Sequence, residues 1–249
     1  MTVNSRIEDI NMSSHLLIYM DVLGCKNLIK EEKDNEILKF FYRYYEMVKS
    51  QAIYRRLYEP ERKVKIFSDN IIIAEEFNHL TIKKEWIGKI LNSFLKRVVQ
   101  SSQFYLLKTG LYVRGAVHLG DLYIDETFVY GKSLLEAYEI ETNVAKYPRV
   151  VLSTEFIHVF NDHIEQLISE KILAKDFDGQ IYVDYFNFEG DDGGRFPVLL
   201  EQIRNSIMWS YQKSNHDARV QKKIQWVIEK FNQECLRSDR ESYLIRDII

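Results

Sequence analysis

The fold of this chain is decided by one apolar stretch, HLLIYMDVL at residues 15–23. The stretch is dense in β-favouring residues and ends near Gly24, which is the pattern of a strand buried on both faces. Asp21 interrupts it. Because a carboxylate in an apolar strand is costly to bury, Asp21 requires a metal ion or a hydrogen-bonding group beside it. The stretch therefore predicts a first strand that is buried on both faces and carries a polar site.

The segments that follow alternate between helical and extended patterns. Apolar residues at three- and four-residue steps predict helices, and β-rich runs bounded by turn residues predict strands. The expected elements are helix 35–57, strands 63–67 and 70–75 joined at Ser68–Asp69, helix 86–99, strand 111–118 after Gly110, strand 122–124 after a turn at Gly120–Asp121, helix 133–145 and strand 149–152. This order predicts an α+β fold with a mixed sheet covered by helices.

The C-terminal part is mainly helical. A helical region near residues 155–173 and a strand near residues 179–186 precede two amphipathic helices. Their apolar stripes are Leu200, Ile203, Ile207 and Tyr211 on the first helix, and Val220, Ile224, Val227 and Phe231 on the second. We expect a C-terminal helical hairpin whose inner faces form core or oligomer contacts. The predicted division is a domain at residues 1–190 and a helical extension at residues 191–249, packed on the same unit.

Composition narrows the classes of protein. The chain has 249 residues, 46% of them apolar, which is enough for a sizeable core and disfavours disorder. Lys and Arg minus Asp and Glu give 34 − 37 = −3, so general binding of nucleic acid through counterion release is not expected. Two distant cysteines do not suggest a disulfide framework, and no apolar run is long enough to cross a bilayer. These features predict a cytoplasmic protein without a membrane partner.

Two aspartates are the candidate metal ligands. Asp69 lies at the tip of the predicted hairpin, and Asp21 lies in the first strand. Two neighbouring Asp side chains bind Mg²⁺ in an oxygen-rich site and position phosphates. An isolated Asp at a strand end is more often a cap or turn residue, so spacing alone leaves both interpretations open.

Four segments carry a family resemblance in the right order. They are IYMDVLGCKNL at 18–28, KVKIFSDNIIIA at 63–74, LYVRGAVHLGDLY at 111–123 and VYGKSLLEAYEIETNVAKYPRVVLS at 129–153. Together they resemble the class III nucleotidyl (adenylate/guanylate) cyclase family, and the Arg-Gly strand and Ala-x-Tyr-Pro-Arg sequence are similar to those of a divergent bacterial subset. The resemblance covers residues 15–153. It implies a ferredoxin-like palm that converts a nucleoside triphosphate to a cyclic nucleotide messenger with Mg²⁺ or Mn²⁺, in a homodimer.

The resemblance also implies roles for individual residues. Asp21 and Asp69 match the two metal-binding carboxylates, and the main-chain carbonyl of Val22 is the expected additional oxygen. Lys65 matches the purine-reading lysine, although a solvated edge-strand lysine is the alternative. Phe128 occupies the second base-selecting position, where an aromatic ring can stack or belong to the core but cannot read a base edge by hydrogen bonds.

Two positions depart from the family pattern. Leu135 and Glu139 stand where the family has the Asn and the Arg that orient the ribose and stabilise charge on the phosphoryl group. A carboxylate would repel that charge, so the ordinary mechanism is damaged. Arg114 or Arg149 is a candidate for supplying the missing cation and binding substrate, although an arginine in a sheet by default pairs with a buried carboxylate. We expect Glu136 and Glu139 to face these arginines.

Three functions remain open at this point. The first is the cyclase, and the second is a catalytically degenerate nucleotide-binding sensor or interaction module, which Leu135 and Glu139 favour. Retention of both Asp21 and Asp69 argues for the enzyme. The third is metal-dependent phosphodiester hydrolysis or nucleotide joining on the same palm.

Overall fold

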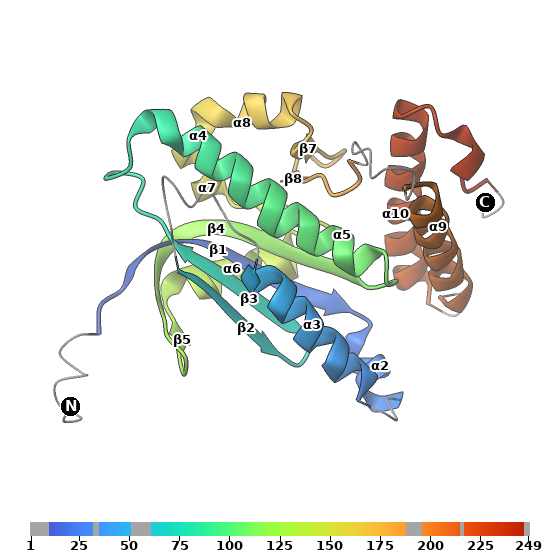
Figure 1. Cartoon of the computed structure of the whole chain (residues 1–249), viewed down its shortest axis with the longest axis horizontal. Coiled ribbons are helices and arrows are strands. Elements are labelled where there is room, and N and C mark those ends of the chain that lie inside the picture. Colours follow the sequence, from blue (N-terminus) through green and yellow to red (C-terminus); the bar gives the residue numbers. More distant parts are fainter. Residues whose placement is uncertain (1–9, 32–34, 51–60, 188–195, 215–216, 247–249) are drawn as a thin grey trace.

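The computed structural model describes residues 10–31, 35–50, 61–187, 196–214 and 217–246. Its centre is a sheet with the strand order β2-β3-β1-β4-β6-β8-β7, and β5 pairs with β4 outside this path (Figure 1). The strands are β1 (Ser13–Leu23), β2 (Arg62–Phe67), β3 (Asn70–Glu76), β4 (Tyr112–Ile124), β5 (Val129–Tyr130), β6 (Val150–Leu152), β7 (Leu173–Lys175) and β8 (Ile181–Val183). The predicted first strand is therefore an interior strand of the sheet, between β3 and β4.

The first four strands form the predicted palm. β1 is antiparallel to both of its neighbours, β3 and β4, and β2 is antiparallel to β3. Helix α3 (Glu36–Ser50) connects β1 to β2, and the consecutive helical segments α4 (Lys84–Ser93), η1 (Phe94–Gln100) and α5 (Ser101–Leu107) connect β3 to β4. Each connection thus joins two strands that have a third strand between them. This split β-α-β arrangement, made twice, is the ferredoxin-like topology.

The two faces of the sheet have different covers because side chains alternate along a strand. Ile18, Met20 and Val22 of β1 belong to the large core that also contains residues of α3, α4 and α5. Leu17 and Tyr19 point to the opposite face and pack with Ala137 of α6 (Lys132–Asn143). By the same alternation, Asp21 belongs to the α6 face.

The structure corrects three predicted elements. Gly120 and Asp121 do not form a turn, because β1 begins at Ser13 and pairs both residues into one continuous β4. The helical region after residue 153 is divided at Phe160 into α7 (Thr154–Val159) and α8 (Asn161–Ser169). Its end forms β7, which pairs with β8. Short strands of three residues carry too little periodicity to be distinguished from a helix end.

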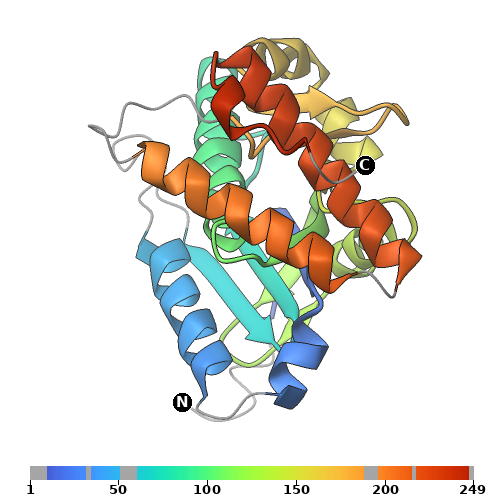
Figure 2. The same ribbon diagram turned by 90° about the vertical axis from the view of Figure 1, so that its right-hand side faces the viewer.

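The C-terminal helices pack on each other beside one end of the sheet, as predicted for a helical hairpin (Figure 2). They are α9 (Phe196–Lys213) and α10 (Ala218–Arg237). Their inner faces form a second core with residues of β4, β6 and β8. Val220 is 41% exposed and was wrongly assigned to the inner stripe, whereas Trp226 belongs to that core. The proposed boundary at residues 190–191 lies outside the described residues.

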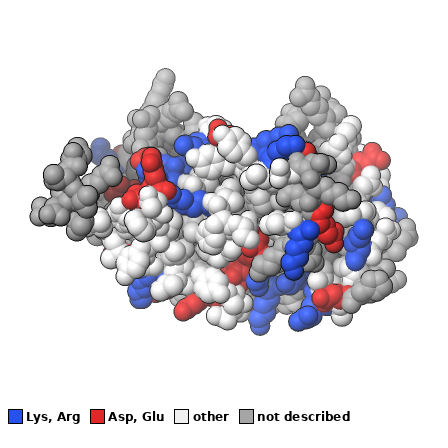
Figure 3. All heavy atoms as spheres, turned by 90° about the horizontal axis from the view of Figure 1, so that it is seen from below, with Lys and Arg blue, Asp and Glu red and all other residues white. Residues whose placement is uncertain are grey.

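The remaining elements are short. Helix α2 (Cys25–Glu31) follows β1, and η2 (Glu241–Tyr243) follows α10. None of the helices in the described part of the chain is long and apolar enough to span a membrane. Lys and Arg are interspersed with Asp and Glu on the face seen in Figure 3, so the described residues form no continuous basic band there.

Candidate functional site

The candidate site lies where β1 ends and the β2–β3 turn begins. Asp21 of β1 is directly opposite Asn70 of β3. At the next step, the Val22 amide donates a hydrogen bond to the Asp69 carbonyl at 2.8 Å. Ser68 has φ 56°, a left-handed conformation that closes the tight turn in front of Asp69. The local pairing therefore brings Asp21, Val22 and Asp69 to the same end of two adjacent strands.

Asn70 links the Asp69 carboxylate to the face of the sheet that carries Asp21. Its side-chain amide donates to Asp69 Oδ1 at 3.3 Å, and its Oδ1 accepts a hydrogen bond from the Tyr19 hydroxyl at 2.5 Å. Burial raises the pKa of Tyr19 to about 12, with further contributions from the negative charges of Glu141, Asp21 and Asp69. The hydroxyl therefore stays protonated at neutral pH, and three carboxylates surround it.

Arg114 is the cation beside Asp21. The two residues face each other across β1 and β4, with Arg114 Nε 3.3 Å from Asp21 Oδ2. The same nitrogen lies 2.5 Å from Glu141 Oε1 of α6. Both Asp21 and Arg114 remain partly exposed, at 20% and 24% of their side chains, whereas Glu141 is 3% exposed. Arg114 is thus held by a buried carboxylate next to a carboxylate that solvent reaches.

Sequence reasoning missed Glu141. It named Glu136 and Glu139 instead, but Glu136 pairs with His118 at 3.1 Å and with Lys132 at 3.0 Å, and Glu139 is exposed. A signal was present, because the buried residues of α6 are Ser133, Ala137 and Glu141, at four-residue steps. This spacing places one stripe of the helix against the sheet. Burial raises the pKa of Glu141, and the positive charge of Arg114 offsets only part of this increase.

The two base-binding candidates lie near one another. Lys65 of β2 is on the Asp21 face and contacts the Glu126 carbonyl in the loop between β4 and β5. Phe128 in this loop is 63% exposed, and its amide donates to Asp125 Oδ1 at 2.6 Å. The exposed ring of Phe128 is available for stacking and is not a core residue.

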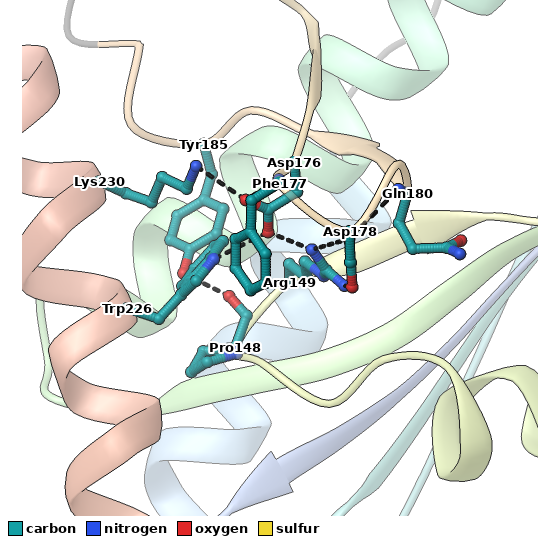
Figure 4. Close-up of polar contacts among 9 residues, drawn as sticks. All are labelled: Pro148, Arg149, Asp176, Phe177, Asp178, Gln180, Tyr185, Trp226 and Lys230. Atoms are coloured by element: carbon teal, nitrogen blue, oxygen red, sulfur yellow. Dashed lines mark hydrogen bonds and ion pairs between the residues drawn. The ribbon is translucent and has the colours of Figure 1, made fainter.

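Arg149 has a different environment. Its side chain is fully buried and contacts Asp176 and Asp178, while Trp226 and Lys230 of α10 also bind Asp176, at 2.8 Å and 3.0 Å (Figure 4). The structure therefore gives Arg149 the ion pairs that an arginine in a sheet forms by default. A nucleotide does not reach this guanidinium in the arrangement seen here.

Leu135 and Glu139 occupy the positions at which the resembled family has an Asn and an Arg. Leu135 is 63% exposed on α6, and Glu139 is exposed on the same helix. Neither contributes a donor to the Asp21 region. Arg114 forms the ion pair with Asp21 there.

The donor set at the end of β1 fits a hard divalent cation. The two carboxylates and the Val22 carbonyl are oxygen ligands, which Mg²⁺ and Mn²⁺ prefer. Within the described residues, no three His, Cys, Asp or Glu side chains converge as a metal site, so the remaining ligands would be backbone, water or substrate oxygens. Arg114 is the local competitor for Asp21.

A cavity of 390 Å³ lies farther along the same sheet face. His118, Ser133 and Glu136 are among its lining residues, and His118 is four residues beyond Arg114 on β4. Asp21, Asp69, Lys65 and Phe128 do not line it. This cavity is separate from the carboxylate pair.

Of the comparisons with known proteins, only the one with solved structures found similar chains. No protein-family model and no curated protein matches the chain. Its structure is similar to class III cyclase catalytic domains at low sequence identity. The adenylyl cyclase CyaB from Pseudomonas aeruginosa matches with a TM-score of 0.46 and 13% identity, over 70% of this chain and 95% of that chain.

Two further similar structures are a guanylyl cyclase domain and a cyclase-like ATP-binding protein. The guanylyl cyclase domain of the RhoGC fusion protein from the aquatic fungus Blastocladiella emersonii matches with a TM-score of 0.43 and 14% identity, over 69% of this chain and 94% of that chain. A class III adenylyl cyclase-like ATP-binding protein from Pseudomonas aeruginosa matches with a TM-score of 0.47 and 10% identity, over 72% of this chain and 41% of that chain.

Proposed function

We propose that the protein is a divergent nucleotidyl cyclase that converts a nucleoside triphosphate to a cyclic nucleotide with Mg²⁺ or Mn²⁺. The observation that supports this proposal is the register of β1 and β3, in which Asp21 lies opposite Asn70 and the Val22 amide donates to the Asp69 carbonyl. A fold that needs no ligand gains nothing from two carboxylates at that point, because their repulsion opposes folding.

Each residue has a part in this reaction. Asp21, Asp69 and the Val22 carbonyl would hold the metal, which lowers the pKa of the ribose 3′-hydroxyl and aligns it with the α-phosphate when bound. Lys65 donates to a base edge, and the exposed Phe128 ring stacks on the base. Arg114 stands next to Asp21 and offers positive charge to the phosphate chain in place of the family arginine.

We also propose that the protein acts as a homodimer. Large apolar side chains of α6 and β5 are exposed. Leu135 and Tyr138 of α6 are 63% and 49% exposed, and Tyr130 of β5 is 72% exposed. Exposed apolar surface of this kind favours association with a second chain. Light scattering after gel filtration tests this, and a monomer at all concentrations would contradict it.

The decisive experiment is incubation of the purified chain with each of the four nucleoside triphosphates and Mn²⁺, followed by mass spectrometry. A cyclic mononucleotide and pyrophosphate are the expected products. A linear product or a dinucleotide would instead indicate hydrolysis or joining on the same palm. The base that gives the fastest turnover identifies the substrate.

A second candidate function is a non-catalytic nucleotide-binding sensor. The observation that favours it is the pairing of Asp21 with Arg114, together with Leu135 and Glu139 at the positions of the family Asn and Arg. An arginine that neutralises a metal ligand weakens metal binding. Measurable triphosphate binding without turnover of any of the four triphosphates would support the sensor and reject the cyclase.

A further inference from the structure

The C-terminal helix α10 shares a hydrophobic core with the elements that carry the candidate site. Ile224 and Val227 of α10 share a core with Leu23 at the end of β1, Tyr112 at the start of β4 and Ile140 of α6. Each of these three partners lies within two residues of Asp21, Arg114 or Glu141. Figure 2 shows α10 beside α9 at this end of the molecule. The helix is therefore part of the wall around the Asp21 region.

Lys223 precedes Ile224 and brings a charge to this wall. Its side chain is half-buried and interacts electrostatically with Arg114, Asp21 and Glu141. Burial lowers the pKa of Lys223, and the charge of Arg114 lowers it further, against the attraction of Asp21 and Glu141. Among the described residues, no carboxylate forms a direct ion pair with Lys223. The Lys223 ammonium thus has no ion-pair partner among the described residues.

The charges of the cluster suit an anionic ligand that arrives with a metal. Asp21, Asp69 and Glu141 contribute three negative charges, and Arg114 and Lys223 contribute two positive charges, which sum to 2 − 3 = −1. One divalent cation changes the sum to +1, and a second changes it to +3. A site of that sign attracts a polyphosphate chain, and the two basic side chains are its natural donors.

We propose that Lys223 and Arg114 form the subsite for the phosphate chain, so that the C-terminal hairpin completes the nucleotide site of the palm. The inference rests on the proposed nucleotide site at Asp21 and Asp69. It assigns a substrate-binding role to a helix that lies outside the segments resembling the cyclase family. The palm alone then has Arg114 but lacks its second phosphate donor.

The test compares Lys223→Met with Lys222→Met in the full chain. Lys222 is the matched control, because it is adjacent on α10 and exposed. The measurement is calorimetric binding of inorganic tripolyphosphate and of the four nucleoside triphosphates, each with Mg²⁺, alongside the corresponding nucleosides. Loss of a charge-assisted contact predicts roughly tenfold to hundredfold weaker tripolyphosphate and triphosphate binding for Lys223→Met. Nucleoside binding and the Lys222→Met variant should be unchanged, and Lys223→Arg should retain most of the affinity.

The outcomes separate this inference from the proposed function. If the wild-type chain binds triphosphates and Lys223→Met binds them equally well, the inference is wrong and the proposed function stands. If Lys223→Met loses nucleoside and triphosphate binding together, or unfolds at a lower temperature than Lys222→Met, Lys223 has a structural role and the inference is also wrong. If the wild-type chain binds no triphosphate with Mg²⁺, the proposed function fails and this inference fails with it.

Discussion

Arg114 and Arg149 make similar ion pairs in regions with opposite properties. Each contacts two carboxylates, Asp21 and Glu141 in the first case and Asp176 and Asp178 in the second. The Arg149 side chain is 0% exposed, whereas Arg114 is 24% exposed. The comparison teaches that the residue types of an ion-pair cluster do not reveal its role, but the exposure of its members does.

Hydrogen bonding sharpens the difference. Both oxygens of Asp176 are in use, because Trp226 and Arg149 bind Oδ2 while Lys230 and the Phe177 amide bind Oδ1. Such a saturated network stabilises the packing of α10 on the sheet. Asp21 receives a single long contact of 3.3 Å from Arg114 and faces solvent with a fifth of its side chain. The Asp176 cluster is therefore closed, whereas the Asp21 cluster retains capacity for a ligand.

The largest effect is expected on turnover, when a negative charge is removed from the partly exposed site of Asp21 and Asp69. Asp21→Asn and Asp69→Asn should each abolish metal-dependent turnover, because an amide replaces an anionic oxygen ligand. Folding should be unchanged by circular dichroism. Asp162→Asn, on the exposed start of α8, is the matched control and should keep full activity. Wild-type turnover in either site variant would reject the metal-binding role.

At the buried Arg149 cluster, a substitution should lower the unfolding free energy instead of turnover. Arg149→Met leaves Asp176 and Asp178 without their guanidinium partner, and breaking such a buried pair costs roughly 3–5 kcal/mol of unfolding free energy. Urea denaturation measures this loss. Arg149→Lys should recover only part of it, because an ammonium does not reproduce the two-pronged contact with Asp178. A loss below about 1 kcal/mol, which is typical of surface pairs, would contradict the comparison.

Arg114→Met should be less destabilising than Arg149→Met and should cost roughly 1–3 kcal/mol of unfolding free energy. The cost arises because Glu141 loses its partner, and it is limited because Arg114 and Asp21 are partly hydrated. The same denaturation experiment measures it beside Arg149→Met. The variant should also weaken triphosphate binding, which Arg149→Met does not do when tested below its unfolding transition. A larger loss of unfolding free energy for Arg114→Met than for Arg149→Met would contradict the assignment of Arg149 to the closed cluster.

The smallest effect concerns pH, and its sign should differ between the two clusters. Burial raises the pKa of Glu141, so the native state takes up a proton more readily there than the unfolded chain. As pH falls from neutral through that raised pKa, wild-type unfolding free energy should rise relative to Glu141→Gln. The gain is complete below the unfolded pKa of about 4.3.

Asp176 should behave oppositely. Burial raises its pKa, but hydrogen bonds from Lys230 and Trp226 outweigh this effect and leave the pKa below its ordinary value. Its contribution to stability is present above the unfolded pKa of about 3.9 and is lost as pH falls through the native pKa. Wild type should therefore lose stability relative to Asp176→Asn in that range. Denaturation at a series of pH values measures both differences, and equal signs would contradict the assigned environments.

The palm was predictable because its signals are local. The apolar run of β1, the turn at Ser68–Asp69 and the periodic helices each follow from neighbouring residues, and together they allow few topologies. The continuation of β4 through Gly120 was not predictable, since it depends on pairing with Ser14 and His15 more than 100 positions away in the chain. Glycine favours a turn locally, and the partner strand overrides that preference.

The sequence by itself determined the first strand, the hairpin and the two aspartates, because the cost of burying Asp21 is visible in a single apolar run. Only the tertiary structure decided which arginine stands beside them. Arg114 and Arg149 occur in similar strand contexts, but a carboxylate from α6 holds one at a partly exposed edge, while a loop and α10 enclose the other. Solvent access and charge partners arise from segments distant in the chain, so no local pattern contains them.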